Sequence, residues 1–419
     1  MSDLLQRVTE IARTAKKASR ALALAPTAVR DAALRAAAQA LRADEAAILE
    51  ANVKDLAAAK AKGLTDAMTD RLRLDHARLE DIAVACEAVA KLPDPVGEVT
   101  EDWTRPNGLR IIRRRVPIGL VAIIFESRPN VTVDAAALCL KSGNGCVLRG
   151  GSEAIHTNIA LSKSFATGLR AAGLPAEAVT LLPFTDREAV PALGSLRGIV
   201  DIIVPRGGPG LIEAVVNSAK VPVIKHDAGI CHVYVHAQAD LAMAEQIVLN
   251  AKCQRPSACN ALETLLVDAA VAEKFLPKMA AALSAKQTEV RACAQSRPLM
   301  PGAKAATEQD FRTEHLGLIL NVKIVAGLAE AVAHVEDYGS HHSDAIITAD
   351  ESAARAFLAQ IDSACVYWNA STRFTDGGEF GFGAEVGIST DRLHARGPMG
   401  IRELTTWKFE IVGQGQVRG

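Results

Sequence analysis

Gly119-Leu-Val-Ala-Ile-Ile-Phe125 is a continuous apolar run with the length of a buried β-strand. The turn Glu126-Ser-Arg-Pro-Asn130 follows it, and residues 132–142 then have the character of a helix that stops at Gly143-Asn-Gly145. Cys146-Val-Leu-Arg149 predicts the next strand, and Gly150-Gly-Ser-Glu153 opens another helix. This order of elements is typical of an open parallel sheet, whose ligands bind at the carboxyl ends of the strands. The predicted fold class is α/β.

The same pattern returns later in the chain. A strand is predicted at residues 198–204, and the loop Pro205-Arg-Gly-Gly-Pro-Gly210 leads into a helix from Leu211. Glycine-rich turns before helices let backbone N–H groups approach a phosphate closely. However, neither this loop nor the one at 150–153 contains Gly-x-Gly-x-x-Gly, and the chain has no Gly-Lys-Ser/Thr phosphate loop. The pattern therefore favours a nucleotide site without identifying the nucleotide.

A second stretch, Lys252-Cys-Gln-Arg-Pro-Ser-Ala-Cys-Asn-Ala-Leu-Glu-Thr-Leu-Leu-Val267, carries two cysteines in a polar loop before an apolar strand. A nucleophilic cysteine acts as a thiolate and needs an electropositive, accessible environment, and Arg255 supplies a cation four residues before Cys259. The alternative is a buried, inert structural cysteine. Of the two thiols we favour Cys259, because Cys253 lies on the upstream limb of the loop.

Composition limits the classes of function. The formal net charge is −1, charged residues make up 23% and aromatic residues 4%, which argues against nucleic acid or a membrane surface as a partner. The eight cysteines are dispersed without Cys-x-x-Cys pairs or Cys/His ligand spacing, so neither disulfides nor a metal site is predicted. With no apolar leader or spanning stretch, we expect a cytoplasmic protein of two packed domains.

The segments outside these stretches have a scaffold character. Residues 2–92 predict helices, and residues 268–298 predict a helical pair. Residues 99–116 predict a hairpin that turns at Pro106-Asn-Gly108, and residues 403–413 predict one more strand. The four arginines on the hairpin form either an anion site or a solvated or subunit-contact edge. The edge is the commoner use of such charges.

The motifs together resemble the aldehyde dehydrogenase superfamily, and within it the gamma-glutamyl phosphate reductase family, over nearly the whole chain. The pieces that carry the resemblance are Ser127-Arg-Pro-Asn-Val-Thr-Val-Asp134, Lys141-Ser-Gly-Asn144, Leu148-Arg-Gly-Gly151, Pro205-Arg-Gly-Gly208, Gln254-Arg-Pro-Ser257 with Cys259-Asn260, Tyr338-Gly-Ser-His-His-Ser-Asp344 and Gly387-Ile-Ser-Thr-Asp-Arg-Leu-His-Ala-Arg-Gly-Pro398.

The resemblance implies an aldehyde dehydrogenase-like architecture of two open parallel-sheet domains and a small β element for oligomerisation. Residues 1–98 and 117–228 would form the nucleotide-binding domain, and residues 229–398 the catalytic domain. Residues 99–116 and 399–419 would form the oligomerisation element, which implies a homo-oligomer. The implied reaction is the NADPH-dependent reduction of L-glutamyl 5-phosphate to L-glutamate 5-semialdehyde in proline biosynthesis. A glutamate 5-kinase is the implied upstream partner.

The resemblance also assigns residues. Arg149, Ser152 and Glu153 would hold the adenosine ribose or its 2′-phosphate, Gly207 and Gly208 the pyrophosphate, and Glu314 the nicotinamide ribose. An arginine at position 149 favours NADPH over NADH. Cys259 would form the thioester, and Asn130 would donate to the oxyanion. The candidates for contacts with the substrate or its phosphate are Arg255, Arg128, Arg396 and Glu385.

One departure from hydrolytic relatives is informative. Those enzymes carry a general-base glutamate in a Glu-Leu-Gly-Gly stretch, where this chain has His226-Asp-Ala-Gly229. Hydrolysis of a thioester needs a base within reach of a water, whereas a reductase needs the thioester to survive. The sequence therefore favours phosphate-coupled chemistry. The alternatives are a related phosphorylating or CoA-acylating dehydrogenase and a catalytically silent protein that retains the fold.

Overall fold

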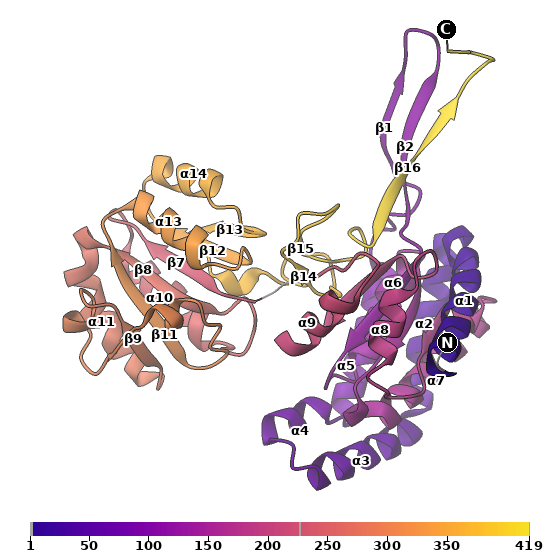
Figure 1. The fold of residues 1–419 in the computed structure, drawn as a ribbon, viewed down its shortest axis with the longest axis horizontal. Coiled ribbons are helices and arrows are strands. Elements are labelled where there is room, and N and C mark those ends of the chain that lie inside the picture. Colours follow the sequence, from indigo (N-terminus) through magenta and orange to yellow (C-terminus); the bar gives the residue numbers. More distant parts are fainter. Residues whose placement is uncertain (1–2, 226–227, 419) are drawn as a thin grey trace. The chain divides into compact units, whose positions relative to one another are not determined.

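The computed structural model describes residues 3–225 and 228–418, and the chain divides into two compact units (Figure 1). Unit 1 comprises Met1–Lys225, Gly381–Gly387 and Pro398–Gly419, and unit 2 comprises His226–Phe380 and Ile388–Gly397. Each unit contains a parallel sheet flanked by helices, which confirms the predicted α/β class. Residues 381–387 and 398–419 belong to unit 1, although they follow most of unit 2 in the sequence.

Unit 1 is built on a four-stranded parallel sheet in the order β5-β4-β3-β6. Strand β3 (Leu120–Phe125) is buried at every position, as its apolar run predicts. Leu120, Ala122 and Ile124 pack into one cluster with residues of the first helix. The other strands are β4 (Gly145–Arg149), β5 (Val179–Leu181) and β6 (Ile202–Arg206). The helices are α1 (Asp3–Leu24), α2 (Thr27–Ala43), α3 (Glu45–Ala61), α4 (Asp66–Leu72), α5 (His76–Lys91), α6 (Val131–Lys141), α7 (Ile155–Ala171), α8 (Ala189–Ser195) and α9 (Pro209–Ser218), with short 3-10 turns η1 (Ser152–Ala154) and η2 (Ala176–Ala178).

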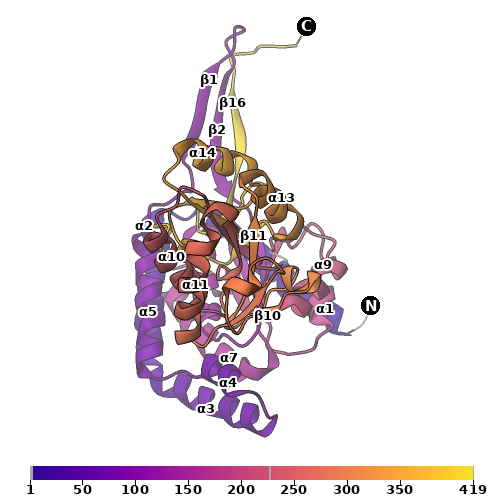
Figure 2. The same ribbon diagram turned by 90° about the vertical axis from the view of Figure 1, so that its left-hand side faces the viewer.

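A separate three-stranded antiparallel sheet belongs to unit 1 and stands out from the rest of it (Figures 1 and 2). It joins the predicted hairpin, β1 (Val99–Thr104) and β2 (Arg110–Pro117), to the C-terminal strand β16 (Thr405–Val412). The four hairpin arginines pair with carboxylates of the same sheet or its approach, namely Arg110 with Asp102, Arg113 with Glu101, Arg114 with Glu410 and Arg115 with Glu98. These pairs favour the edge interpretation over an anion site.

Unit 2 is built on a seven-stranded parallel sheet in the order β10-β9-β11-β8-β7-β12-β13. Its strands are β7 (Cys231–Val235), β8 (Leu262–Asp268), β9 (Glu289–Ala292), β10 (Lys304–Ala305), β11 (Ile319–Val325), β12 (Ser343–Ile347) and β13 (Cys365–Trp368). Its helices are α10 (Leu241–Cys253), α11 (Ala269–Ala285), α12 (Glu308–Phe311), α13 (Leu328–Tyr338) and α14 (Glu351–Gln360), with turns η3 (Arg297–Leu299) and η4 (Thr372–Phe374). Short strands β14 (Ile388–Ser389) and β15 (Gly397–Pro398) lie in the C-terminal loops. The predicted helical pair at 268–298 is wrong in its second half, which contains β9.

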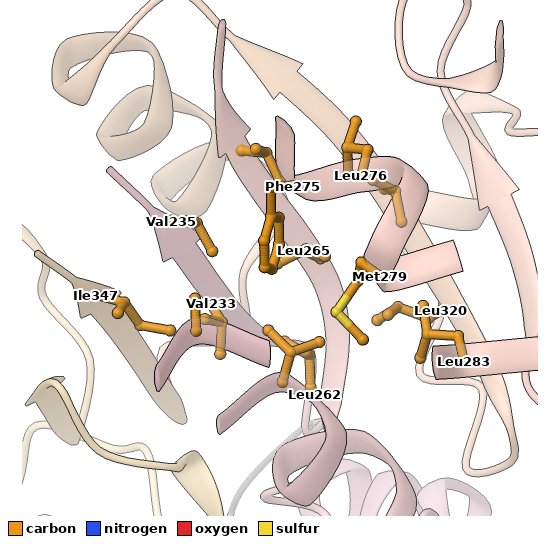
Figure 3. Close-up of a cluster of buried hydrophobic side chains, with 14 of the residues drawn as sticks. Val233, Val235, Leu262, Leu265, Phe275, Leu276, Met279, Leu283, Leu320 and Ile347 are labelled. Atoms are coloured by element: carbon orange, nitrogen blue, oxygen red, sulfur yellow. The ribbon is translucent and has the colours of Figure 1, made fainter. Parts of the chain in front are cut away.

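Both faces of this sheet are buried, because alternate residues of each strand serve opposite cores. Val233 and Val235 pack with α10 and α11, and Figure 3 shows Phe275 and Met279 of α11 against that face. Tyr234 lies on the other face with residues of α13 and α14. Because all the strands are parallel, their amino ends share one edge, which we call the amino edge.

Within residues 3–225 and 228–418, every helix is too short or too polar to span a membrane.

Candidate active site

Cys259 lies at the amino edge of unit 2, in the loop between α10 and β8. The thiol-bearing residue is half-buried, whereas the preceding Arg255 is exposed. Two backbone hydrogen bonds shape the loop, from Ala258 N–H to the Arg255 carbonyl at 3.1 Å and from Ala261 N–H to the Ala258 carbonyl at 2.9 Å. The loop is therefore a compact turn that presents Cys259 just before the buried strand.

Strand β7 and the turn η4 fix the peptide backbone at this thiol and directly after it. The thiol of Cys231, on fully buried β7, donates to the Cys259 carbonyl at 3.3 Å. Thr372 donates to the Asn260 carbonyl at 2.7 Å, and the Asn260 side chain donates to the Thr375 carbonyl at 2.9 Å. Gly229 lies so close that a side-chain carbon there would sit 2.0 Å from the Cys259 carbonyl oxygen. The position of the loop is thus set by residues distant in sequence.

Glu314 belongs to the same edge, because it precedes β11. The backbone N–H of Gly229 donates to its carboxylate, so one glycine contacts both Cys259 and Glu314. Burial raises the pKa of Glu314, while that hydrogen bond and the positive charge of Lys252 oppose the rise. The predicted nucleophile and the predicted nicotinamide-ribose carboxylate are therefore brought together within one unit.

A fully buried ion pair connects the segments that carry Cys259 and Glu314. Lys252, in the last turn of α10, and Glu263, on β8, lie 2.8 Å apart with no exposed side-chain surface. Burial lowers the pKa of Lys252 and raises that of Glu263 to about 7. The second oxygen of Glu263 accepts the N–H of Leu316 at 3.3 Å, and Leu316 has a left-handed φ of 53°. The pair therefore ties the strained turn after Glu314 to the strand after Cys259.

The two cysteines of the loop have different surroundings. The half-buried Cys253 ends α10 and packs against the α10–α11 core, with its sulfur 3.5 Å from the Thr288 hydroxyl. Cys259 instead occupies the turn bordered by Gly229 and Asn260. This contrast favours Cys259 as the nucleophile, although its catalytic role stays a prediction.

Unit 1 contains a cavity of about 670 Å³ at the carboxyl ends of its parallel strands, where the fold rule places ligands. Its lining includes the predicted Arg149, Ser152, Glu153 and Gly208. Gly207 lies beside it, since a side-chain carbon at that position would meet the Glu126 carboxylate at 2.6 Å. The cavity is of the size that holds a small ligand or part of a cofactor.

The cavity lining carries both signs of charge, with Arg149 and Arg187 as donors for a nucleotide phosphate beside the carboxylates of Glu126, Glu153 and Glu188. Arg149 donates to the Thr185 carbonyl at 2.9 Å, but its buried Nε has no hydrogen-bond partner among the described residues. Burial lowers the pKa of Arg149. The Glu153 carboxylate accepts from the backbone N–H and the hydroxyl of Ser127, a residue with a left-handed φ of 48°. Glu153 is thus occupied by the β3–α6 turn, and the arginine is left with an unused donor.

The remaining predicted residues are divided between the units. Asn130 and Arg128 lie on the β3–α6 turn of unit 1, where Asn130 donates to Asp134 at 2.7 Å. Glu385 also belongs to unit 1. Arg396 belongs to unit 2, where both of its terminal nitrogens donate to Asp362 at 2.7 Å. Their substrate roles stay predictions. His226 and Asp227, which replace the general-base stretch, lie outside the described residues.

Sequence reasoning missed several members of the amino edge. No local motif marks Cys231 or the Lys252–Glu263 pair. Thr372 and Arg373 lie more than a hundred residues after Cys259 in the sequence. Gly229 was visible as the glycine after the turn at 226, but its contact with Cys259 required the structure. Only pairing of distant strands brings these residues to one place.

Comparison with known proteins agrees with this geometry. The aldehyde dehydrogenase family model matches residues 5–299. A gamma-glutamyl phosphate reductase of Moorella thermoacetica is 54% identical over 404 residues, which cover 96% of this chain and 97% of that protein. The crystal structure of a gamma-glutamyl phosphate reductase of Thermotoga maritima is 45% identical, covers 100% of both chains and superposes with a TM-score of 0.96. An NADP complex of a glyceraldehyde-3-phosphate dehydrogenase from Methanocaldococcus jannaschii has a TM-score of 0.68 at 17% identity, which shows a shared fold. The chain therefore belongs to the aldehyde dehydrogenase family of oxidoreductases and, within it, to the gamma-glutamyl phosphate reductases.

Proposed function

We propose that the chain reduces L-glutamyl 5-phosphate to L-glutamate 5-semialdehyde with NADPH and releases inorganic phosphate, as a step of proline biosynthesis. The name of its 54% identical relative supports the substrate. The observation that carries the chemistry is the amino edge of unit 2. There the Cys231 thiol donates a hydrogen bond to the carbonyl of the half-buried Cys259. Gly229 contacts Cys259 and also donates its backbone N–H to Glu314.

Cys259 acts as the nucleophile. Its thiolate attacks the acyl carbon, the phosphate leaves with the electron pair of the broken C–O bond, and a thioester remains. Fixing the Cys259 backbone limits the motion of the sulfur, which is the positional contribution that such catalysis needs. Asn130 is the proposed oxyanion donor, and a donor of this kind contributes about 10²–10³ in rate. Arg128, Arg396 and Glu385 are the proposed contacts for the charged groups of the substrate.

The proposed cofactor contacts are the residues that the family resemblance assigns. Arg149, Ser152 and Glu153 would hold the adenosine ribose and its 2′-phosphate, Gly207 and Gly208 the pyrophosphate, and Glu314 the nicotinamide ribose. The bound cofactor supplies the hydride. Arg149 lines the cavity and has a buried donor with no partner among the described residues, which supports NADPH over NADH, because a 2′-phosphate offers several charged oxygens where a 2′-hydroxyl offers one neutral oxygen.

A homo-oligomer is the proposed assembly. Edge strand β16 exposes Trp407, Phe409 and Ile411, which are 40%, 53% and 62% accessible. A three-stranded sheet with an exposed apolar face is stabilised when another surface covers that face. Replacing Phe409 and Ile411 by serine should lower the molar mass measured by light scattering after size exclusion to that of one chain, 44.2 kDa. An unchanged mass would contradict this role of the sheet.

The reaction is tested most directly in reverse. Purified protein, NADP⁺ and glutamate 5-semialdehyde should form NADPH only when inorganic phosphate is present. Cys259→Ala should abolish NADPH formation, and Cys253→Ala, the matched control in the same loop, should retain it. NADPH formation without phosphate would indicate hydrolytic chemistry and contradict the proposal. Wild-type activity in Cys259→Ala would contradict the assigned nucleophile.

A further inference from the structure

The turn η4 is fastened to the residue that follows Cys259. Besides the Thr372 and Thr375 hydrogen bonds, the Asn260 side chain donates to the carbonyl of Arg373 at 3.3 Å. Asn260 is only 4% exposed, so these bonds are shielded from water. The backbone of Arg373 is therefore fixed with respect to Cys259, although 114 positions separate the two residues in the sequence.

The side chain of Arg373 is also oriented toward the loop. Its Nε donates to the Gln254 side-chain oxygen at 2.8 Å, which leaves the two terminal nitrogens without a hydrogen bond to the described residues. Arg373 is half-buried, and Gln254 directly precedes Arg255. The neutral side-chain amide of Gln254 thus orients the Arg373 guanidinium and leaves its charge uncompensated by a carboxylate.

Two arginines consequently lie near one thiol. Burial lowers the pKa of Arg373, and repulsion by Arg255 lowers it further, whereas the Cys259 thiolate and then Asp376 raise it. Repulsion by Arg255 exceeds attraction by Asp376. Among the described residues, neither arginine forms an ion pair with a carboxylate. Like charges held together at a reactive thiol indicate that an anion from outside the chain belongs between them.

We propose that Arg373, acting with Arg255, binds the phosphoryl group of the acyl phosphate and of the inorganic phosphate that leaves. This inference rests on the proposed function and adds a substrate-contacting residue to it. As the Cys259 sulfur bonds to the acyl carbon, the C–O bond to phosphate breaks and its electron pair stays on the phosphate oxygen. The planar guanidinium of Arg373 offers its two terminal nitrogens as a fork for that dianion.

The test measures the KM for inorganic phosphate in the reverse reaction. Arg373→Gln should raise this KM by about 10- to 100-fold, the loss of one or two hydrogen bonds to a charged group. The KM for NADP⁺ should stay unchanged. Arg373→Lys keeps the charge but lacks the fork, so its phosphate KM should rise several-fold. Arg355→Gln removes an exposed arginine of α14 that pairs with Glu351, and it should behave as wild type.

A second measurement does not depend on turnover. Inorganic phosphate should slow the alkylation of Cys259 by iodoacetamide in the wild type, and this protection should be lost in Arg373→Gln. A wild-type phosphate KM and intact protection in a folded Arg373→Gln would overturn the inference. If that variant does not fold, a wild-type phosphate KM in Arg373→Lys overturns it instead. Failure of the proposed function looks different, because the wild type itself would then show no dependence on phosphate.

Discussion

Gly229→Ala should move the proposed nucleophile, Cys259, without removing its thiol. The added carbon would lie 2.0 Å from the Cys259 carbonyl oxygen, 2.6 Å from its carbon and 2.7 Å from Cα, all of them backbone atoms. An ordinary contact begins near 3.4 Å, so the Cys259 backbone would have to retreat by about 1.4 Å. Overpacking of this kind costs about 1–3 kcal/mol of stability. A displacement of roughly 1 Å at a reacting group costs about 10²-fold in rate.

We therefore expect Gly229→Ala to fold, with a lower melting temperature, and to lose about 100-fold in kcat for phosphate-dependent NADPH formation. Iodoacetamide should still alkylate Cys259, because the thiol remains present and only its position changes. Gly317→Ala is the matched control in the same unit, since its added carbon would meet only the His315 carbonyl at 3.6 Å. A Gly229→Ala enzyme with wild-type kcat would refute the reasoning, since it would mean that the loop tolerates the shift.

Three further predictions concern the same unit. Lys252→Met should destabilise the fold by about 3–5 kcal/mol in urea unfolding, because Glu263 stays buried with the Leu316 N–H but without its cation. Without Lys252 the buried carboxyl must take up a proton on folding, which costs more free energy as the pH rises, so the loss should be smaller at pH 6 than at pH 8; a loss independent of pH would contradict this. Burial lowers the pKa of His334 to about 2, so the unfolded state binds a proton below about pH 6.5 that the folded state cannot, and stability should fall by up to about 1.4 kcal/mol per pH unit toward acid. His334→Phe should flatten that fall; an unaltered pH profile of unfolding would argue against it. Cys231→Val removes the thiol that donates to the Cys259 carbonyl and should lower kcat by a few-fold. Cys231→Ser keeps a donor at this position, so its kcat should be close to that of the wild type. Equal kcat values for the two variants would show that the hydrogen bond does not contribute to catalysis.

Much of the fold follows from local pattern. The run at 119–125 is apolar at every position because β3 is buried on both faces, and the turn at 106–108 marks a hairpin with its own hydrogen-bonded register. The pattern failed at β9, where Glu289-Val-Arg-Ala292 has four residues, two of them charged. Arg291 there pairs with both Glu289 and Asp310, so its polar character comes from a tertiary network rather than from exposure. A segment this short has too few residues for periodicity to identify a strand.

The site was predictable where its residues lie in one loop. Cys259 and Arg255 share a turn, and the carboxyl-end rule for open sheets predicts the cavity at Arg149 and Gly208. The same rule gives no guidance in unit 2, because Cys259 lies at the amino ends of its strands. Arg373 could not be foreseen, since its place depends on hydrogen bonds to Asn260 that only the folded chain makes.

The location of Cys259 also explains why cations gather around it. Activated cysteines commonly lie at helix N-termini, where the helix dipole stabilises a thiolate. Cys259 instead follows the C-terminus of α10, which ends at Cys253 and whose dipole disfavours a nearby negative charge. Lys252 in the last helical turn is paired with Glu263, whereas Arg255 brings positive charge into the loop and Arg373 brings a second cation from η4. In the proposed mechanism, a Cys259 thiolate would therefore depend on the charge of these side chains rather than on a helix dipole. Neither arginine forms an ion pair with a carboxylate among the described residues, so the feature that offsets the dipole also suits both arginines to meet a phosphate.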